Sequence, residues 1–126
     1  MGGLLLGPLA AEPEKKEIDG VSYFVVRAPA AAVRLVWKDK VGKQLRTFPE
    51  AANSLKQEGL EVKVLMNGGI FEPGGIPSGL FIQEGKKLQP VNRRPGRGNF
   101  FLMPNGIFLI GGDEAAVIRT DEFKEG

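Results

Sequence analysis

Apolar residues along the chain fall into short runs that are separated by stretches rich in glycine and proline. The clearest run covers residues 62–66 (Val-Lys-Val-Leu-Met), ends at Asn67-Gly68-Gly69 and resumes with Ile70-Phe71. The run is too short for a helix and β-branched at two positions, so it predicts a buried strand. Asn67 would then stand where this strand leaves the core.

Residues 49–58 are the one stretch with a helical pattern of apolar positions. Thr47 and Glu50 have the spacing of a capping box, and Gly59 is a suitable C-terminal stop. The expected buried face consists of Ala51, Ala52, Leu55 and the aliphatic part of Lys56.

Strands are predicted for residues 21–27, 32–37, 60–66, 80–83, 87–91, 99–103, 107–110 and 115–119. We expect the first two to pair with each other, and Pro104-Asn105-Gly106 to form a hairpin turn before residues 107–110. A further helix could begin within residues 120–124. The predicted fold class is α+β, a mixed and mostly antiparallel sheet of short strands with one main helix.

The 126 residues suffice for one domain. Residues 1–11 are small and apolar, like the second half of a secretory signal peptide, and residues 12–17 resemble a solvated linker. Residues 1–17 are therefore expected to be a leader remnant or a flexible linker, and residues 18–126 the domain. A leader implies a periplasmic or secreted protein. No run reaches the roughly 18 apolar residues of a membrane span.

The composition excludes several kinds of chemistry. The chain has no cysteine and no histidine, which removes disulfides, thiolate metal sites, a cysteine nucleophile and the commonest general base. Carboxylates, lysine, tyrosine, amides and backbone N–H groups remain, and no cofactor or metal is expected.

Charge is unevenly distributed although the formal net charge is only +2. Residues 84–98 carry five cations and one acid, a net charge of +4, whereas residues 113–126 have a net charge of −3. Arg94 and Arg97 could fork onto phosphate oxygens, and Gly96 and Gly98 leave N–H groups free for an anion. The alternative is a solvated basic turn.

Asn67-Gly68-Gly69 is the second candidate binding element. Gly68 and Gly69 are expected to allow positive φ angles and the close approach of a ligand at the mouth of the sheet. The alternative is a tight turn without a binding role. Asn99, which precedes Phe100-Phe101, is a third candidate because its amide could hold a sugar hydroxyl or cap a turn.

Four segments occur in an order that resembles the phosphodiester glycosidase family, whose members include the N-acetylglucosamine-1-phosphodiester α-N-acetylglucosaminidase. The segments are Asn67-Gly68-Gly69-Ile70-Phe71, Pro77-Ser78-Gly79-Leu80, Gly98-Asn99-Phe100-Phe101-Leu102 and Pro104-Asn105-Gly106-Ile107-Phe108. The similarity is greatest to small, exported bacterial members and covers about residues 33–120.

The resemblance implies hydrolysis of a sugar-1-phosphodiester or a related glycosidic link, with Asn67, Gly68, Gly69 and Phe71 in the substrate pocket. Family members have a second half containing Ser-Gly-Pro and Asp-Gly-Gly segments, and the chain resembles only the first half. Glycosidases generally use two carboxylates. The nearest candidates are Glu72 and Asp113, which are otherwise ordinary loop acids.

Two other functions fit the residues. One is a non-catalytic module that binds carbohydrate or an anion through Asn67 and the arginine loop. The other is a nucleic-acid binder that uses Arg93, Arg94 and Arg97 with Phe100 and Phe101, against which the near-neutral charge argues. A half-domain would also leave a sheet edge unpaired, which predicts a homo-oligomer.

Overall fold

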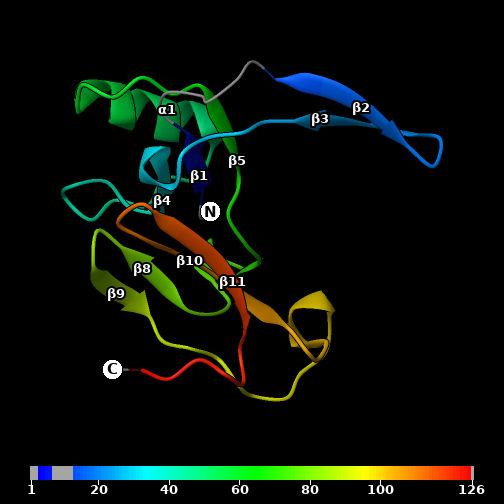
Figure 1. The fold of residues 1–126 in the computed structure, drawn as a ribbon. Coiled ribbons are helices and arrows are strands. Elements are labelled where there is room, and N and C mark those ends of the chain that lie inside the picture. The colour runs from blue at the N-terminus through cyan, green and yellow to red at the C-terminus, as the bar shows by residue number, and fades with distance from the viewer. Residues whose placement is uncertain (1–2, 7–12, 126) are drawn as a thin grey trace.

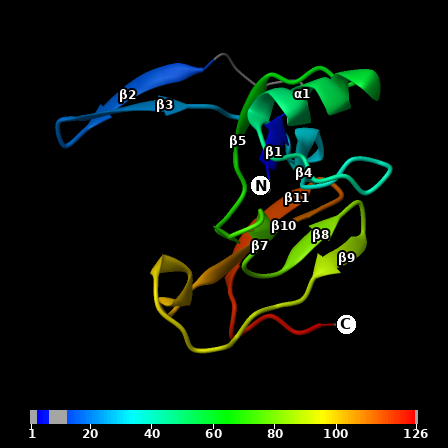
Figure 2. The same ribbon diagram turned by 180° about the vertical axis from the view of Figure 1, so that it is seen from behind.

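The structure, a computed structural model, describes residues 3–6 and 13–125. It is an α+β fold, as predicted, with one α-helix and short antiparallel strands grouped in small sheets (Figures 1 and 2). The helix, α1 (Phe48–Gln57), packs near a three-stranded sheet. The order of this sheet is β4 (Val33–Val36), β1 (Gly3–Leu6), β5 (Val64–Asn67).

Four two-stranded hairpins complete the fold. They are β2 (Glu14–Ile18) with β3 (Val21–Val25), β6 (Phe71–Glu72) with β7 (Ile76–Pro77), β8 (Phe81–Gln83) with β9 (Lys86–Gln89), and β10 (Gly106–Gly111) with β11 (Glu114–Arg119). Two 3-10 helices, η1 (Ala30–Ala32) and η2 (Asn99–Phe101), precede β4 and β10.

Local signals predicted α1 correctly. Thr47 Oγ1 accepts a hydrogen bond from the backbone N–H of Glu50, and the Glu50 carboxylate accepts one from that of Thr47. Backbone N–H groups, of Arg46 first and also of Thr47, lower the pKa of Glu50. Gly59 ends the helix at a φ of 81°.

The core lies between α1 and the three-stranded sheet. Val36, Leu45, Ala51 and Leu55 are buried together, and Leu60, Val62 and Leu65 pack against them. Lys56, expected at this face, is exposed. Trp37 is also buried, and its ring meets Phe81 edge-on with centroids 5.9 Å apart.

Two parts of residues 1–17, the stretch expected to be a leader remnant or a flexible linker, form strands in the structure. Gly3–Leu6 forms β1, the central strand, with Gly3 opposite both Val36 and Asn67. Glu14–Ile18 forms β2, because antiparallel pairing with β3 satisfies its backbone despite its charged side chains. The rest of the proposed leader, residues 1–2 and 7–12, lies outside the described residues.

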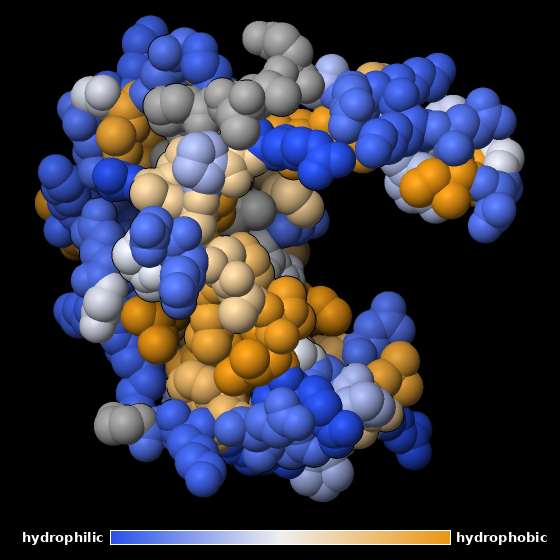
Figure 3. Space-filling model, viewed as in Figure 1, coloured by the Kyte–Doolittle hydropathy of each residue, from blue (hydrophilic) through white to orange (hydrophobic). Residues whose placement is uncertain are grey.

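The predicted partner of residues 32–37 was therefore wrong, since β3 pairs with β2 and β4 pairs with β1. The β2–β3 hairpin extends away from the rest of the molecule (Figures 1 and 2). Its side chains are largely exposed, including Tyr23 and Phe24. Figure 3 shows a mostly hydrophilic hairpin, whereas hydrophobic surface gathers over the centre of the same face.

Three further predictions near the C-terminus were wrong. Residues 99–103 form no strand, because Asn99–Phe101 is the 3-10 helix η2. Pro104-Asn105-Gly106 is therefore no hairpin turn, and β10 instead pairs with β11 through Gly112-Asp113. Residues 120–124 make turns without a helix. A backbone hydrogen bond between the two regions competes with the local sequence pattern. The Thr120 N–H donates to Asn105 O at 3.0 Å.

The side-chain amide of Gln83 joins β8 to the end of β4. Gln83 Oε1 accepts hydrogen bonds from the backbone N–H groups of Trp37 at 2.8 Å and Lys38 at 3.2 Å. Gln83 Nε2 donates to the Lys38 carbonyl oxygen at 2.8 Å. Trp37 Nε1 donates to Gly75 O at 2.9 Å, which ties the β6–β7 turn to the same point.

Replacing Gln83 with methionine should lower the free energy of unfolding by about 1–3 kcal/mol, because partly buried backbone groups lose their partners. Gln44→Met is the matched control. Gln44 Oε1 is buried without a hydrogen-bond partner among the described residues, so this change should be neutral or stabilising. Urea unfolding of both variants measures the difference, and equal losses would contradict the role given to Gln83.

Removing residues 1–11 should lower the urea midpoint strongly and expose apolar surface to a hydrophobic dye, because β4 and β5 lose the strand between them. Removing residues 1–2 alone keeps β1 and is the control. A truncated chain as stable as the full one would instead indicate a dispensable leader.

Candidate functional site

One cavity gathers all four sequence segments that carry the family resemblance. Its volume is about 310 Å³. The segments contribute Gly68, Gly69 and Ile70; Pro77, Gly79 and Leu80; Asn99 and Phe100; and Asn105, Gly106, Ile107 and Phe108. We call this cavity, completed by Leu35, Phe81, Val91, Asn92 and Thr120, the motif pocket.

Ser78 organises one wall of the motif pocket although it does not line it. Ser78 is buried, and its backbone N–H donates to Ile70 O at 2.9 Å. Its Oγ donates to Glu72 Oε1 at 2.8 Å, and its carbonyl oxygen accepts from Asn92 Nδ2 at 2.9 Å. A single small residue thus connects β6, β7 and the segment that contains Asn92.

Two phenylalanine rings pack directly on glycine backbones at this site. A Cβ on Gly79 would lie 2.9 Å from the Phe100 ring, and a Cβ on Gly96 would lie 2.8 Å from the Phe101 ring. The two rings meet edge-on, with centroids 5.1 Å apart. Glycine is required at both positions because any side chain would displace an aromatic ring.

The amides of Asn92 and Asn105 are both anchored by backbone groups. Asn92 donates to Ser78 O, and its Oδ1 accepts from the Arg94 N–H at 3.1 Å. Asn105 Nδ2 donates to Phe100 O at 2.7 Å, whereas Asn105 Oδ1 is buried without a hydrogen-bond partner among the described residues. Asn105 therefore has an unused acceptor.

The structure brings only part of the predicted substrate-binding set together. Gly68, Gly69 and Asn99 line the motif pocket, whereas Asn67 and Phe71 do not. Asn67 ends β5 opposite Gly3 and is exposed, and Phe71 pairs with Pro77.

Neither Gly68 nor Gly69 is among the described glycines with positive φ, so that expectation was wrong. The chain bends at Gly69 on its way from β5 to β6 without making the tight turn considered as the alternative. What the motif supplies is a wall without side chains, and a Cβ on Gly69 would meet nothing within 4 Å.

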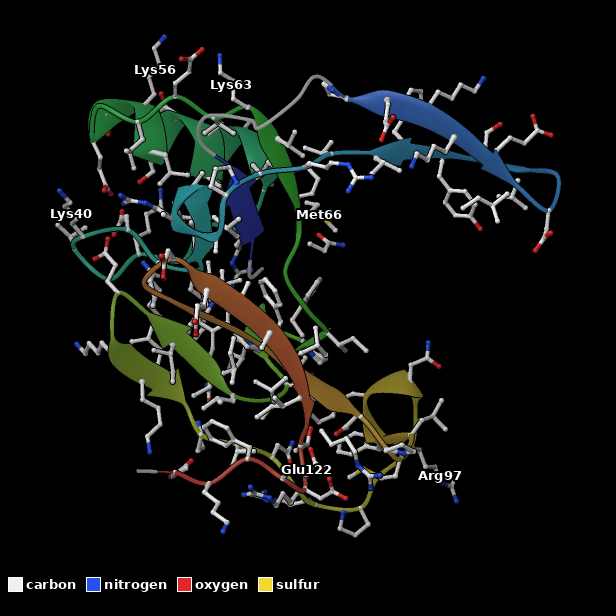
Figure 4. All side chains as sticks on the ribbon, viewed as in Figure 1. Lys40, Lys56, Lys63, Met66, Arg97 and Glu122 are labelled. Atoms are coloured by element: carbon white, nitrogen blue, oxygen red, sulfur yellow. The ribbon has the colours of Figure 1, made fainter. Side chains whose placement is uncertain are left out.

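The arginines of the basic loop do not line the motif pocket. Arg93 donates to the carbonyl oxygens of Thr120 and Phe123 and so secures the C-terminal segment. Arg94 contributes its backbone N–H to Asn92. Arg97 lies at the periphery of the molecule with its side chain directed outward (Figure 4).

Two acidic residues of the C-terminal segment, Asp121 and Glu125, form ion pairs with Arg119 and Lys87. A hydrogen bond from Arg119 is the main cause that lowers the pKa of Asp121, and a hydrogen bond from Lys87 is the main cause that lowers the pKa of Glu125. Arg93 and Arg119 line a second cavity, which shares Asn105 and Thr120 with the motif pocket.

The two candidate acids occupy different places. Glu72 touches the pocket wall through Ser78. Asp113 lies in the turn beyond Gly111, the last residue of β10, and Gly111 is about 10 Å along the strand from Phe108 at about 3.4 Å per residue. Within the described part of the chain, no three acidic side chains form a group that could hold a metal ion.

Sequence reasoning did not predict that Asn92, Asn105 and Thr120 line the motif pocket. Asn105 stood within a motif segment but was interpreted as a turn residue because it lies between Pro104 and Gly106. Asn92 and Thr120 carried no local signal, since only tertiary contacts bring them to the pocket.

Comparison with known proteins adds one relative. Over 104 residues, 82% of this chain, the sequence is 32% identical to a protein of Escherichia coli (strain K12) described as "Uncharacterized protein YigE". The chain spans 41% of the length of that relative. No protein-family model and no solved structure matches the chain. Among the helices of the described residues, none has the length and apolar character needed to cross a membrane.

Gly79→Ala should displace the Phe100 ring and destabilise the protein by about 1–3 kcal/mol through overpacking. Gly69→Ala adds the same methyl group at another pocket position where it meets nothing within 4 Å. Urea unfolding and the NMR shifts of the aromatic protons report both effects. Unchanged Phe100 resonances in Gly79→Ala would show that the ring does not rest on this glycine.

Proposed function

We propose that the chain carries the sugar-binding part of a phosphodiester-glycosidase-like hydrolase, which acts on a sugar-1-phosphodiester or a related glycosidic link. The observation that supports this is the convergence of all four resembling segments on one cavity. These segments are separated in sequence by loops and by the β8–β9 hairpin. Because all four segments line one pocket, their occurrence together in the sequence has a structural explanation.

Glu72 is the proposed acid at this site. Its carboxylate accepts a hydrogen bond from Ser78, whose neighbours Pro77 and Gly79 both line the pocket. Hydrolysis by the usual route needs a second carboxylate roughly 5–9.5 Å away. Asp113 lies in the turn of the β10–β11 hairpin and does not line the motif pocket, so the proposal assigns it no role.

A non-catalytic carbohydrate-binding module is the second candidate. The observation that favours it is that no residue lining the motif pocket is ionisable. A nucleic-acid-binding role has less support, because Phe100 and Phe101 rest on glycines and Arg93 is engaged with two carbonyl oxygens. Stacking on bases requires free aromatic faces.

We also propose an exported location and association through an open sheet edge, which follow from the resemblance and from the short sheets. β4 and β5 are the outer strands of the three-stranded sheet. Sedimentation as a monomer at micromolar concentration would argue against the association.

The decisive assay measures release of N-acetylglucosamine from a synthetic N-acetylglucosamine-1-phosphodiester by the full chain. We expect slow release that falls at least tenfold in Glu72→Gln, a change that retains the acceptor for Ser78 but removes the charge. Glu61→Gln, at an exposed position before β5, is the control. Binding of the sugar without any release would favour the module, and neither binding nor release would reject both.

A further inference from the structure

Two asparagines of the chain are followed directly by glycine, in the pairs Asn67-Gly68 and Asn105-Gly106. In such a pair the backbone nitrogen of the glycine can attack the side-chain amide carbon of the asparagine, because glycine has no Cβ to restrict the approach. The attack requires a backbone that can move and an amide side chain that can turn toward it. The local sequence is the same in both pairs, so the fold decides which of them reacts.

The fold restrains Asn105-Gly106 on both sides of the peptide bond. Asn105 Nδ2 donates to Phe100 O at 2.7 Å, and Asn105 Oδ1 is buried. Asn105 O accepts a hydrogen bond from the Thr120 N–H at 3.0 Å, and Gly106 pairs with Arg119 as the first residue of β10. Because the reaction would break these contacts, it requires a local opening of the structure, which costs free energy.

Asn67-Gly68 has fewer restraints. Asn67 is the last residue of β5, an outer strand of the three-stranded sheet, where it pairs with Gly3. Asn67 and Gly68 are both exposed, and Gly68 lies outside the strands. Within the described part of the chain, no side-chain hydrogen bond involves Asn67. The end of an outer strand frays at little cost in free energy, so the backbone here can reach the conformation needed for attack.

We infer that Asn67 is a site of spontaneous deamidation in the folded protein and that the fold protects Asn105 from the same reaction. The Gly68 nitrogen forms a bond to Asn67 Cγ and gives its proton to the solvent, and the side-chain nitrogen leaves as ammonia. Water then opens the cyclic imide at either of its carbonyl carbons, which yields aspartate or isoaspartate. The net reaction exchanges water for ammonia and uses neither an enzyme nor an oxidant.

Either product alters the chain at the edge of the motif pocket. Gly68 and Gly69 line this pocket, and no residue of its lining is ionisable. Deamidation places a carboxylate directly before Gly68, and isoaspartate also lengthens the main chain by a methylene group at this point. The inference is independent of the proposed function, because it concerns the covalent chemistry of the chain and not a ligand.

Incubation of the folded chain at mildly alkaline pH, followed by tryptic digestion and mass spectrometry, tests the inference. Trypsin separates the two asparagines because it cuts between them, after Lys86 and after Arg97. Asn67 should deamidate at least about tenfold faster than Asn105, since only Asn105 must wait for a local opening. In urea, where the fold is lost, the two rates should become similar.

Equal rates in the folded chain, or a faster reaction at Asn105, would overturn the inference. A folded chain in which Asn67 stays intact while the unfolded chain deamidates would overturn it as well. These comparisons use the wild-type chain and do not depend on the folding of a variant.

A pair of variants tests the attacking nitrogen. Gly68→Ala should slow the reaction at Asn67 about tenfold, because a Cβ restricts the backbone next to the amide. Gly69→Ala adds the same methyl group one residue later, where it meets nothing within 4 Å, and should react like the wild type. Deamidation of Asn67 at the wild-type rate in Gly68→Ala would contradict attack by this nitrogen.

Discussion

Three hydrogen bonds between the Gln83 amide and the backbone of Trp37 and Lys38 join two parts of this molecule. On one side lies the core of α1 and the three-stranded sheet, and on the other lies the β8–β9 hairpin (Figure 1). The amide occupies the place that a neighbouring strand would take, since it offers both an acceptor and a donor to the backbone. The indole of Trp37 extends the same junction to Gly75. The wall of the motif pocket formed by residues 77–81 is thus secured both by this junction at its far end and by the bond from Asn92 to Ser78.

Glycine and asparagine residues have different roles at the site, close packing for the first and hydrogen bonding to the backbone for the second. Gly79 and Gly96 let aromatic rings approach the backbone, and Gly68 and Gly69 leave the pocket wall bare. Asn92 and Asn105 donate side-chain hydrogen bonds to backbone carbonyl oxygens around the pocket. Asn105 Oδ1 has no hydrogen-bond partner among the described residues. The arginines of residues 93–97, which the sequence pattern suggested as phosphate ligands, do not line the pocket. Arg93 instead binds backbone carbonyl oxygens of the C-terminal segment. Charged side chains thus stay out of the cavity lining, which consists of apolar and uncharged polar residues.

The sequence predicted those features whose causes are local. The capping box at Thr47 and Glu50 and the stop at Gly59 gave the helix to within one residue at each end. Strand pairing depends on distant segments, so the role of Gly3–Leu6 as a central strand could not be read from a short run of leucines. The Phe100-Phe101 pair resembled part of a strand, but contacts with Gly79 and Gly96 fold it into a turn. For the same reason the motif segments indicated where a pocket would form, whereas Asn92 and Thr120 became visible only in three dimensions.

The central position of β1 has a consequence for how the chain folds during synthesis. Gly3–Leu6 is translated before both of its neighbours, Val33–Val36 and Val64–Asn67. The sheet must therefore close over large sequence separations, and such contacts are formed slowly. Until β5 has been translated, β1 has only one of its two partners, and an unpaired strand edge can pair with other chains.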